Sequence, residues 1–250
     1  MLAVILAAGT STRLRPLTDN TPKALIQVLG RSMLERSIEN LHAVGVRDIV
    51  IVTGYLGDRI DELVARRYAG EPIHLVRNPE YATKGNGNST LTTRHLVAGK
   101  DFLLLDGDVI YQPGVLQALL DSPHPDVIAL HRSRVLGPEN EEMKLATDAD
   151  GWVVKIAKEI PAAEAAGESI GIERFGAATS ARLFETLEAR IVHGRAGGKV
   201  SDHYEHAFQQ MADEGVKLGV VEIDRYYVED IDDPADLERV QAEMRSLGMA

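Results

Sequence analysis

Three positively charged side chains lie close together near the start of the chain: Arg13, Arg15 and Lys23. They follow an apolar run at residues 2–6, which has the pattern of a strand buried on both faces. Residues 7–9 (Ala-Ala-Gly) carry little side-chain bulk, so the backbone there can approach a ligand closely. Exposed N–H groups with Arg and Lys at the carboxyl end of a strand suit a triphosphate. We expect nucleotide contacts from Leu6, Ala7, Ala8, Gly9 and Thr10, and catalytic roles for Arg13 and Lys23.

The alternative for this stretch is an ordinary connection that carries surface cations. A loop of about fifteen residues between a strand and a helix is unusual unless it binds something. The commoner phosphate-binding patterns, Gly-x-Gly-x-x-Gly and Gly-x-x-x-x-Gly-Lys-Ser/Thr, are absent from it. The phosphate-loop interpretation therefore rests on the loop's own residues.

Two carboxylates predict a metal site. Asp108 follows an apolar strand and a glycine, which places its side chain on the rim of the sheet, facing the phosphates. Mg²⁺ prefers one or two carboxylates together with phosphate oxygens. The stretch 229–232 (Glu-Asp-Ile-Asp) offers a second carboxylate, and alternation puts Asp230 and Asp232 on one face if it is extended. We predict Asp108 and Asp232 as Mg²⁺ ligands. The alternative for Asp232 is the N-cap of a helix near Pro234.

The stretch 85–89 (Gly-Asn-Gly-Asn-Ser) is a candidate base-reading loop. Its glycines open the backbone, and its amide and hydroxyl groups supply both the donors and the acceptors that a pyrimidine edge requires. We expect Gly85, Asn86 and Ser89 to contact the base and Asp106 to face the nucleotide. Taken alone, the stretch is equally compatible with a mobile turn.

Lysines in the second half are candidates for an acceptor phosphate. Lys144, Lys155 and Lys158 fall on neighbouring expected strands, although most surface lysines have no specific role. We assign Lys158 to the acceptor. His203 and His206 are three residues apart and could share a metal, but a carboxylate ligand at a fixed spacing is missing, so we disfavour that interpretation.

Apolar strands alternate with helical stretches through the first half. The expected strands are Leu2–Leu6, Ile49–Thr53, Ile73–Val76 and Phe102–Leu105, and the expected helices are Met33–Val44, Asp58–Tyr68 and a third that runs from the 78–89 loop to Ala98. This alternation predicts a Rossmann-like, doubly wound, mostly parallel mixed α/β sheet, with ligands at the carboxyl ends of its strands. The loops 9–23, 78–89 and 106–111 all lie at those ends.

The second half has shorter strands and no linker rich in Pro or Ser. The expected strands are Val127–Leu130, Met143–Thr147, Val153–Ile156, Ile170–Thr179 and Val216–Glu222, and the expected helices are Ala181–Ile191, Asp202–Glu214 and one from Pro234. We therefore expect a single domain over residues 1–250, with a nucleotide-binding half (1–125) and a smaller acceptor-side lobe (126–250).

Composition limits the class of protein. With 250 residues, 44% of them hydrophobic, the chain can bury one sizeable core. It has no Cys, which excludes disulfides and thiolate metal sites, and its net charge of −11 disfavours a nucleic-acid partner. The apolar run 2–6 is too short to span a membrane, and the features of a signal peptide are missing. We expect a cytoplasmic protein without a membrane partner.

The run Leu6-Ala-Ala-Gly-Thr-Ser-Thr-Arg13, followed by Pro22-Lys23-Ala-Leu25, resembles the signature of the nucleoside triphosphate:sugar-phosphate nucleotidyltransferases. The 85–89 loop resembles the base-reading loops of inositol-1-phosphate and phosphocholine cytidylyltransferases. Glu168-Ser-Ile-Gly-Ile172, followed by Asp202-His-Tyr-Glu205, resembles the acceptor side of cytidylyltransferases that use small phosphorylated alcohols or phosphonates, such as 2-aminoethylphosphonate.

The resemblance implies a GT-A-like nucleotidyltransferase fold and an acceptor site. It places Asp232 at the family's second metal ligand, although Val228 stands where family members usually carry a Trp. Acidic side chains and an aromatic face would favour a cationic headgroup. The residues it implies around the organic part of the acceptor are Glu168, Asp202, Tyr204 and Glu205, although Tyr204 is equally compatible with a core residue of its helix.

We therefore expect nucleotidyl transfer, in which an acceptor oxygen attacks the α-phosphorus of CTP and pyrophosphate departs. Arg13 would hold the β- and γ-phosphates, Lys23 would stabilise charge at the α-phosphoryl group, and Mg²⁺ would bridge the phosphates. The acceptor oxygen is already anionic, so no general base is required. Two alternatives remain: a sugar-1-phosphate nucleotidyltransferase that uses UTP, dTTP or GTP, and a non-catalytic nucleotide-binding regulator. A homo-oligomer is compatible with the sequence.

Overall fold

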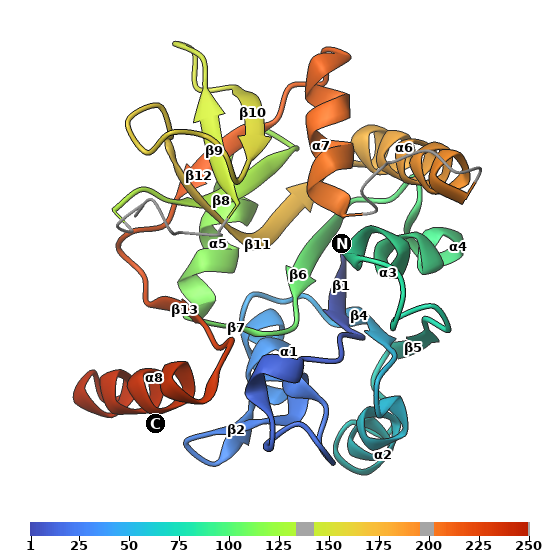
Figure 1. Cartoon of the computed structure of the whole chain (residues 1–250), viewed down its shortest axis with the longest axis vertical. Helices are drawn as coiled ribbons and strands as arrows, with labels where there is room; N and C mark the ends of the chain where they lie inside the picture. The colour runs from blue at the N-terminus through green and yellow to red at the C-terminus, as the bar shows by residue number, and fades with distance from the viewer. Residues whose placement is uncertain (134–142, 196–202, 250) are drawn as a thin grey trace.

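The computed structural model of the chain describes residues 1–133, 143–195 and 203–249 (Figure 1). Within this part of the chain, one sheet of nine strands forms the centre of the molecule. Seven strands follow the order β10-β9-β11-β6-β1-β4-β5, while β8 pairs with β11, and β12 pairs with β8. The mixed α/β fold expected from the sequence is confirmed.

The phosphate loop leaves from the parallel part of this sheet. Its strands are β1 (Leu2–Ala7), β4 (Asp48–Thr53), β5 (Ile73–Arg77) and β6 (Phe102–Asp106). β1 lies between β4 and β6 and runs parallel to both. Because it is covered on both faces, its residues from Leu2 to Ile5 are all buried, which explains the uninterrupted apolar run.

The second half of the chain extends the same sheet with mostly antiparallel pairs. β11 (Gly167–Phe175) runs antiparallel to β6, to β8 (Val127–His131) and to β9 (Lys144–Thr147). β10 (Val153–Ala157) returns from β9 through a turn at residues 148–151, and β12 (Gly219–Glu222) runs parallel to β8. The pairing of β11 with β6 brings the acceptor-side residues next to the end of β6.

Helices cover both faces of the sheet, as a doubly wound fold requires (Figure 1). On the face of Ala3 and Ile5 pack α1 (Met33–Ala43), α2 (Gly57–Arg67) and α5 (Pro113–Asp121). On the face of Leu2 and Val4 pack α4 (Arg94–Val97), α6 (Ala177–Arg195) and α7 (Tyr204–Asp213), beside α3 (Asn86–Thr92). The period of two along β1 thus sorts its side chains between two separate apolar clusters.

A third apolar cluster anchors the C-terminal helix α8 (Pro234–Ser246). It joins Val240 and Met244 of α8 to Leu14 of the phosphate loop and to Ile231. Close by, β13 (Val228–Asp230) pairs with β7 (Val109–Tyr111), and β2 (Gln27–Val28) pairs with β3 (Arg31–Ser32). Single 3₁₀ turns, η1 (Thr12–Leu14) and η2 (Lys23–Leu25), carry two of the predicted cations.

Several expected element bounds were wrong; β12, for example, begins at Gly219 and not at Val216. The strand expected at Ile170–Thr179 begins at Gly167 and ends at Phe175, because the N–H groups of Gly176 and Ala177 donate to the carboxylates of Asp126 and Asp101, 2.8 Å away in each case, and so start α6 early. The base-reading loop is also more helical than expected, since residues 86–89 form the first turn of α3. None of the described helices is both long and apolar enough to cross a membrane.

Candidate active site

Two adjoining pockets open where β1 and β6 end. The phosphate-loop pocket is lined by Leu6, Ala7, Ala8, Gly9, Ser11, Lys23, Ala24, Tyr81, Lys84, Gly85, Asn86, Ser89, Asp106, Gly107 and Asp108. The acid-rich pocket is lined by Arg13, Asn86, Asp106, Asp108, Val109, Met143, Ala157, Lys158, Glu159, Glu168, Ser169, Ile170, Gly171, His203, Tyr204, Glu205, His206, Asp230 and Asp232. The two pockets share Asn86, Asp106 and Asp108.

Backbone contacts fix the floor between the pockets. The N–H of Gly107 donates to the carbonyl oxygen of Leu6, 3.0 Å away. A Cβ on Gly107 would lie 2.4 Å from that oxygen, so only glycine lets β1 and the 106–108 turn come so close. The spacing of Asp106 and Asp108 around this glycine places both carboxyl groups beside the phosphate loop.

A buried threonine braces the phosphate loop. Ser11 has a φ of +46°, which is uncommon for a residue other than glycine. The Thr18 hydroxyl donates to the Ser11 carbonyl oxygen at 2.9 Å, and the Tyr55 hydroxyl donates to the Thr18 carbonyl oxygen at 3.0 Å. These bonds hold the loop in its bent conformation. Neither Thr18 nor Tyr55 was singled out from the sequence, because no local pattern links Tyr55 to Thr18, 37 residues away.

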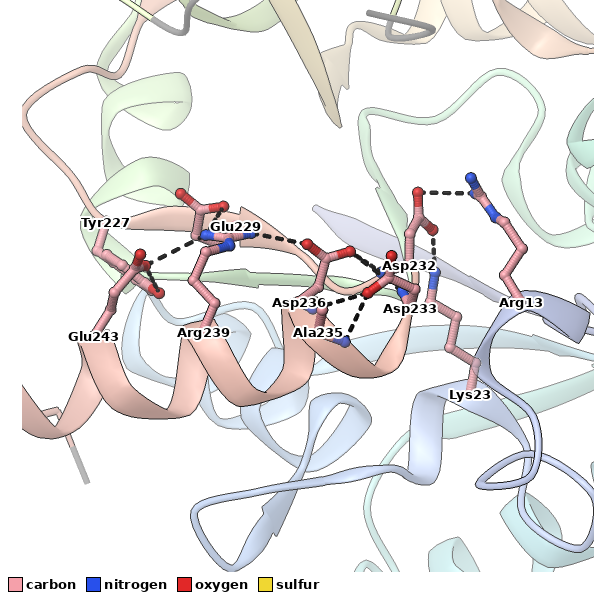
Figure 2. Close-up of polar contacts among 10 residues, drawn as sticks. All are labelled: Arg13, Lys23, Tyr227, Glu229, Asp232, Asp233, Ala235, Asp236, Arg239 and Glu243. Carbon is pink, nitrogen blue, oxygen red and sulfur yellow. Dashed lines mark hydrogen bonds and ion pairs between the residues drawn. The ribbon is translucent and has the colours of Figure 1, made fainter.

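Lys23 lies between the two predicted metal ligands. Its Nζ is 2.7 Å from Asp108 Oδ2. The same Nζ is 2.7 Å from Asp232 Oδ1, and Arg13 is 2.8 Å from the other oxygen of Asp232 (Figure 2). Burial lowers the pKa of Lys23, but Asp108 and Asp232 outweigh it, so that the pKa is raised. Burial likewise raises the pKa of Asp232, but Lys23 and Arg13 outweigh it, and the pKa is lowered. The shifts of these two pKa values favour the charged forms of Lys23 and Asp232.

Asp232 is not the helix cap. The N-cap of α8 is Asp233, whose carboxylate accepts the N–H groups of Ala235 and Asp236 at 2.7 and 2.9 Å. The carboxylate of Asp236 in turn accepts the N–H of Asp232 at 3.1 Å (Figure 2). The capping alternative is therefore wrong for Asp232, and its side chain is free of the helix and directed to Lys23.

The carboxylates fit the Mg²⁺ site expected from the sequence. Asp108 and Asp232 lie far apart along the chain, yet one ammonium group bonds both, so their oxygens converge on one point. Among the described residues, no group of three or more His, Asp or Glu side chains is placed to hold a metal. A two-carboxylate donor set completed by phosphate oxygens is what Mg²⁺ prefers. The His203–His206 alternative gains no third ligand in this part of the chain.

The acid-rich pocket contains the expected acceptor residues. Lys158, Glu168, Tyr204 and Glu205 all line it, and the Tyr204 hydroxyl donates to Asp106 Oδ2 at 2.9 Å. Desolvation raises the pKa of Asp106 well above its usual range, and Asp108 and Glu205 add to the rise. Desolvation also raises the pKa of Glu205, against the opposing effect of its hydrogen bonds. The pocket therefore concentrates acidic groups.

Asn86 lines both pockets. Its Oδ1 accepts the backbone N–H of Tyr204 at 2.9 Å, and its Nδ2 lies 3.4 Å from both oxygens of Glu205. Ser89 bonds Asn78 at 2.9 Å, a contact that also positions it on the pocket wall. A base-reading role for the stretch 85–89 stays a prediction.

The remaining predicted site residues differ in whether they line one of the two pockets. Leu6, Ala7, Ala8 and Gly9 line the phosphate-loop pocket, whereas Thr10 lines neither pocket. Arg13 lines the acid-rich pocket. Lys144 is buried and donates to the Lys158 carbonyl oxygen at 2.6 Å, which is a structural contact. Asp202 lies outside the described residues.

Several lining residues were missed. Tyr81 and Lys84 lie in the 78–89 loop that we singled out, so an aromatic and a cation beside the asparagines were an available signal. Glu159 of the acid-rich pocket was also missed. Gly171 and Asp230 come from stretches already singled out, and the pairing of β11 with β6 and of β13 with β7 brings them to the same pocket.

Comparisons with known proteins identify the family of this chain. A model of the MobA-like NTP transferase domain matches residues 3–199. The CMP-5'-(3-aminopropyl)phosphonate synthase of Streptomyces rubellomurinus is 39% identical over 149 residues, which are 60% of this chain and 23% of that protein. The choline-phosphate cytidylyltransferase of Streptococcus pneumoniae is 42% identical over 108 residues, 43% of this chain and 44% of that protein. This chain therefore aligns with less than half the length of each relative.

Other similarities extend to sugar-nucleotide enzymes. The UTP–glucose-1-phosphate uridylyltransferase AglF of Haloferax volcanii is 37% identical over 111 residues, 44% of each chain. The solved structure of the inositol-1-phosphate CTP transferase from T. maritima matches with a TM-score of 0.80 at 20% identity, over 100% of this chain and 97% of that one, which shows the shared fold. Since the domain model covers well over half of the residues, this chain belongs to the MobA-like NTP transferase family.

Proposed function

We propose that this chain is a Mg²⁺-dependent cytidylyltransferase, which joins CTP to a small phosphorylated alcohol or phosphonate and releases pyrophosphate. The observation that carries the proposal is the junction of the two pockets. Asp106 and Asp108 line both, and Lys23 contacts Asp108 at the same place. A triphosphate in one pocket and an acceptor in the other would meet at this junction, which is the arrangement that nucleotidyl transfer needs.

The roles of the residues follow from where they lie. Lys23 and Arg13 are paired to carboxylates that would hold Mg²⁺, so an incoming triphosphate offers these cations alternative anionic partners. Lys23 then stabilises the charge that develops at the α-phosphoryl group, while Arg13 holds the outer phosphates. Mg²⁺ on Asp108 and Asp232 would supply charge neutralisation of the phosphates. The anionic acceptor oxygen attacks without a dedicated base.

The acceptor class is supported by the charge of the acid-rich pocket. Its lining contains Glu168, which is buried, together with Glu205 and Tyr204. Acidic groups beside an aromatic face favour a cationic or hydroxyl-rich group over a second anion. The names of the two relatives, which act on aminopropylphosphonate and choline phosphate, point to the same class. A cytoplasmic location remains a prediction.

The test is pyrophosphate release by the purified chain with Mg²⁺. Each of CTP, UTP, dTTP and GTP is offered with phosphocholine, 2-aminoethylphosphonate, inositol-1-phosphate, glycerol phosphate and glucose-1-phosphate. We expect CTP with one of the first four acceptors to be the fastest pair. Fast turnover of UTP or dTTP with glucose-1-phosphate, and none of CTP with the other acceptors, would establish the sugar-nucleotide alternative. That alternative is favoured by the similarity to the uridylyltransferase.

A non-catalytic regulator is the more distant alternative. Such a protein needs to bind a nucleotide, but it needs neither two carboxylates that hold a metal ion nor a cation between those carboxylates. The convergence of Lys23, Asp108 and Asp232 speaks against it. Nucleotide binding without pyrophosphate release from any of these pairs would support it.

A further inference from the structure

One buried carboxyl group has no part in the chemistry described above. Glu173 on β11 has no exposed surface, and neither of its carboxyl oxygens has a hydrogen-bond partner among the described residues. A polar group without a partner in the protein interior destabilises the fold, and an apolar side chain of similar volume would be more favourable there. The position of Glu173 in the fold indicates that this carboxyl group has a functional role that offsets its cost in stability.

Glu173 lies behind the wall of the acid-rich pocket. On β11 it is two residues from Gly171, so both face the same side of the sheet. Gly171 faces the Asp106 carboxyl group so closely that a Cβ there would lie 2.4 Å from Asp106 Oδ2. In the register with β6, Glu173 is paired with Leu104, two residues before Asp106 on that same side.

Helix α7 covers this spot from the pocket side. Tyr204 is buried, its hydroxyl donates to Asp106, and its pKa is raised well above the usual range by desolvation, with contributions from Asp106, Glu173 and Glu205. The wall that a pocket ligand would contact therefore consists of Tyr204, Asp106 and Glu205, and Glu173 stands in the layer beneath them.

The electrostatic surroundings make Glu173 responsive to positive charge. Burial raises the pKa of Glu173 well above its usual range, and the negative charges of Asp106 and Glu205 raise it further. An ammonium group in the acid-rich pocket would offset the negative charges of Asp106 and Glu205. The pKa of Glu173 would then fall, and Glu173 would lose its proton to solvent. His203 and Lys158, which act on Glu205, are exposed to solvent and are screened.

Resting on the proposed function, we propose that Glu173 is a specificity-determining residue for a cationic acceptor. Its carboxylate supplies negative charge from beneath Tyr204, which favours an ammonium group over an uncharged group of the same size. Glu173 does not touch the reacting atoms. It acts through the charge it places behind the pocket wall, so its effect is confined to acceptors that carry a positive charge.

The test compares two acceptors of nearly equal shape, 2-aminoethylphosphonate and propylphosphonate, which differ in the replacement of the ammonium group by a methyl group. The variant is Glu173→Gln, which keeps the shape and removes the charge. We expect the KM and the calorimetric Kd for 2-aminoethylphosphonate to rise about tenfold, as for one unit charge acting across a partly desolvated pocket. The values for propylphosphonate should stay within about twofold, and kcat should change little.

Two further variants separate charge from structural damage. Glu173→Leu should be more stable to urea than the wild type, because it removes a partnerless carboxyl, yet it should lose the same cation preference. Glu159→Gln removes an exposed acid from the rim of the same pocket. Its effect should be much smaller, since solvent screens a rim charge. An equal loss in Glu159→Gln would overturn the role of Glu173.

The outcomes distinguish this inference from the proposed function. A wild-type preference for 2-aminoethylphosphonate that survives in Glu173→Gln overturns the inference alone. Equal binding of the two acceptors by the wild type overturns the inference as well. A cation preference in binding that Glu173→Gln abolishes, without pyrophosphate release from any triphosphate, supports the inference and overturns the proposed function.

Discussion

Lys23 is the residue on which the candidate site converges. It is buried, yet its ammonium group bonds two carboxylates that come from the turn after β6 and from the stretch before α8. This pairing neutralises the charges locally and fixes the position of all three groups. The same geometry places the lysine where both pockets meet, next to the expected position of the α-phosphate.

We expect Lys23→Ala to lower kcat by about 100-fold or more while the fold is retained, because a single preorganised cation contributes that much to charge stabilisation. Pyrophosphate release and thermal unfolding measure the two effects. Lys155→Ala, an exposed lysine on β10, serves as the control and should behave like the wild type. Activity of Lys23→Ala within a few-fold of the wild type would remove Lys23 from the mechanism.

Asp108→Asn and Asp232→Asn should each abolish most of the Mg²⁺-dependent activity. Because both carboxylates would serve one ion, the double variant should lose little more than either single variant. Mg²⁺ titrations of turnover, together with calorimetric binding of the ion, test this. If Asp232→Asn lowered only the melting temperature, the second ligand would lie elsewhere.

The ion pairs of Asp232 also predict a pH dependence. Its pKa is lower in the folded protein than the ordinary 3.8, so its contribution to stability is complete above that pH and is lost as the pH falls through the lowered pKa. The difference in free energy of unfolding between wild type and Asp232→Asn should therefore shrink as the pH falls below 3.8. Urea denaturation across this range measures it, and a constant difference would contradict the prediction.

At the scale of elements, the first turn of α8 positions Asp232. Asp233 and Asp236 form a capping box, and Asp236 also holds the backbone N–H of Asp232. Arg239 and Glu243, one and two turns further along, tie the helix to Glu229 and Tyr227 (Figure 2). A helix at the end of the chain thus determines where one candidate metal ligand lies.

We expect Asp233→Ala and Asp236→Ala each to reduce the free energy of unfolding by about 0.5–2 kcal/mol through loss of a cap. Asp236→Ala should also raise the Mg²⁺ concentration needed for half-maximal activity, since the Asp232 backbone loses its anchor. Ser32→Ala is a matched control, because it breaks the capping box of α1 and should cost similar stability without this change in Mg²⁺ dependence. A Mg²⁺ dependence that is the same in all three variants would contradict the role of Asp236.

At the scale of the whole molecule, both pockets lie along one sheet edge that joins the two halves of the chain. Asn86 is the direct link, since it lines both pockets and bonds the start of α7. We therefore expect the nucleotide and the acceptor to bind to residues of one sheet and of the helices that cover it.

We expect CTP with Mg²⁺ to raise the melting temperature more than UTP, dTTP or GTP, because a ligand bound only by the folded state stabilises it. A wrongly paired polar group on the base typically loses about 1–3 kcal/mol, which corresponds to a tenfold to hundredfold weaker affinity. A thermal-shift series at equal nucleotide concentrations measures this. An equal or larger shift with UTP or dTTP would contradict the base assignment.

The sequence by itself determined the local features of this protein. The apolar run of β1, the small residues after it and the cations of the loop were readable because each depends on neighbours in the chain. The alternation of strands and helices was enough to predict the doubly wound sheet and to place the loop of Lys23 and the turn of Asp108 at the carboxyl ends of its strands. The acids of the acceptor side were expected only from the family resemblance.

Only the tertiary structure decided which distant groups meet. That Asp233 caps α8 and Asp232 faces Lys23, that distant aspartates start α6 early, and that Asn86 bonds α7 all depend on contacts between remote segments. Glu173 appears in the sequence as one acid in a strand, and its burial behind Tyr204 follows only from the pairing of β11 with β6. Which remote segments pair depends on the packing of the whole chain, so local sequence patterns do not predict these contacts.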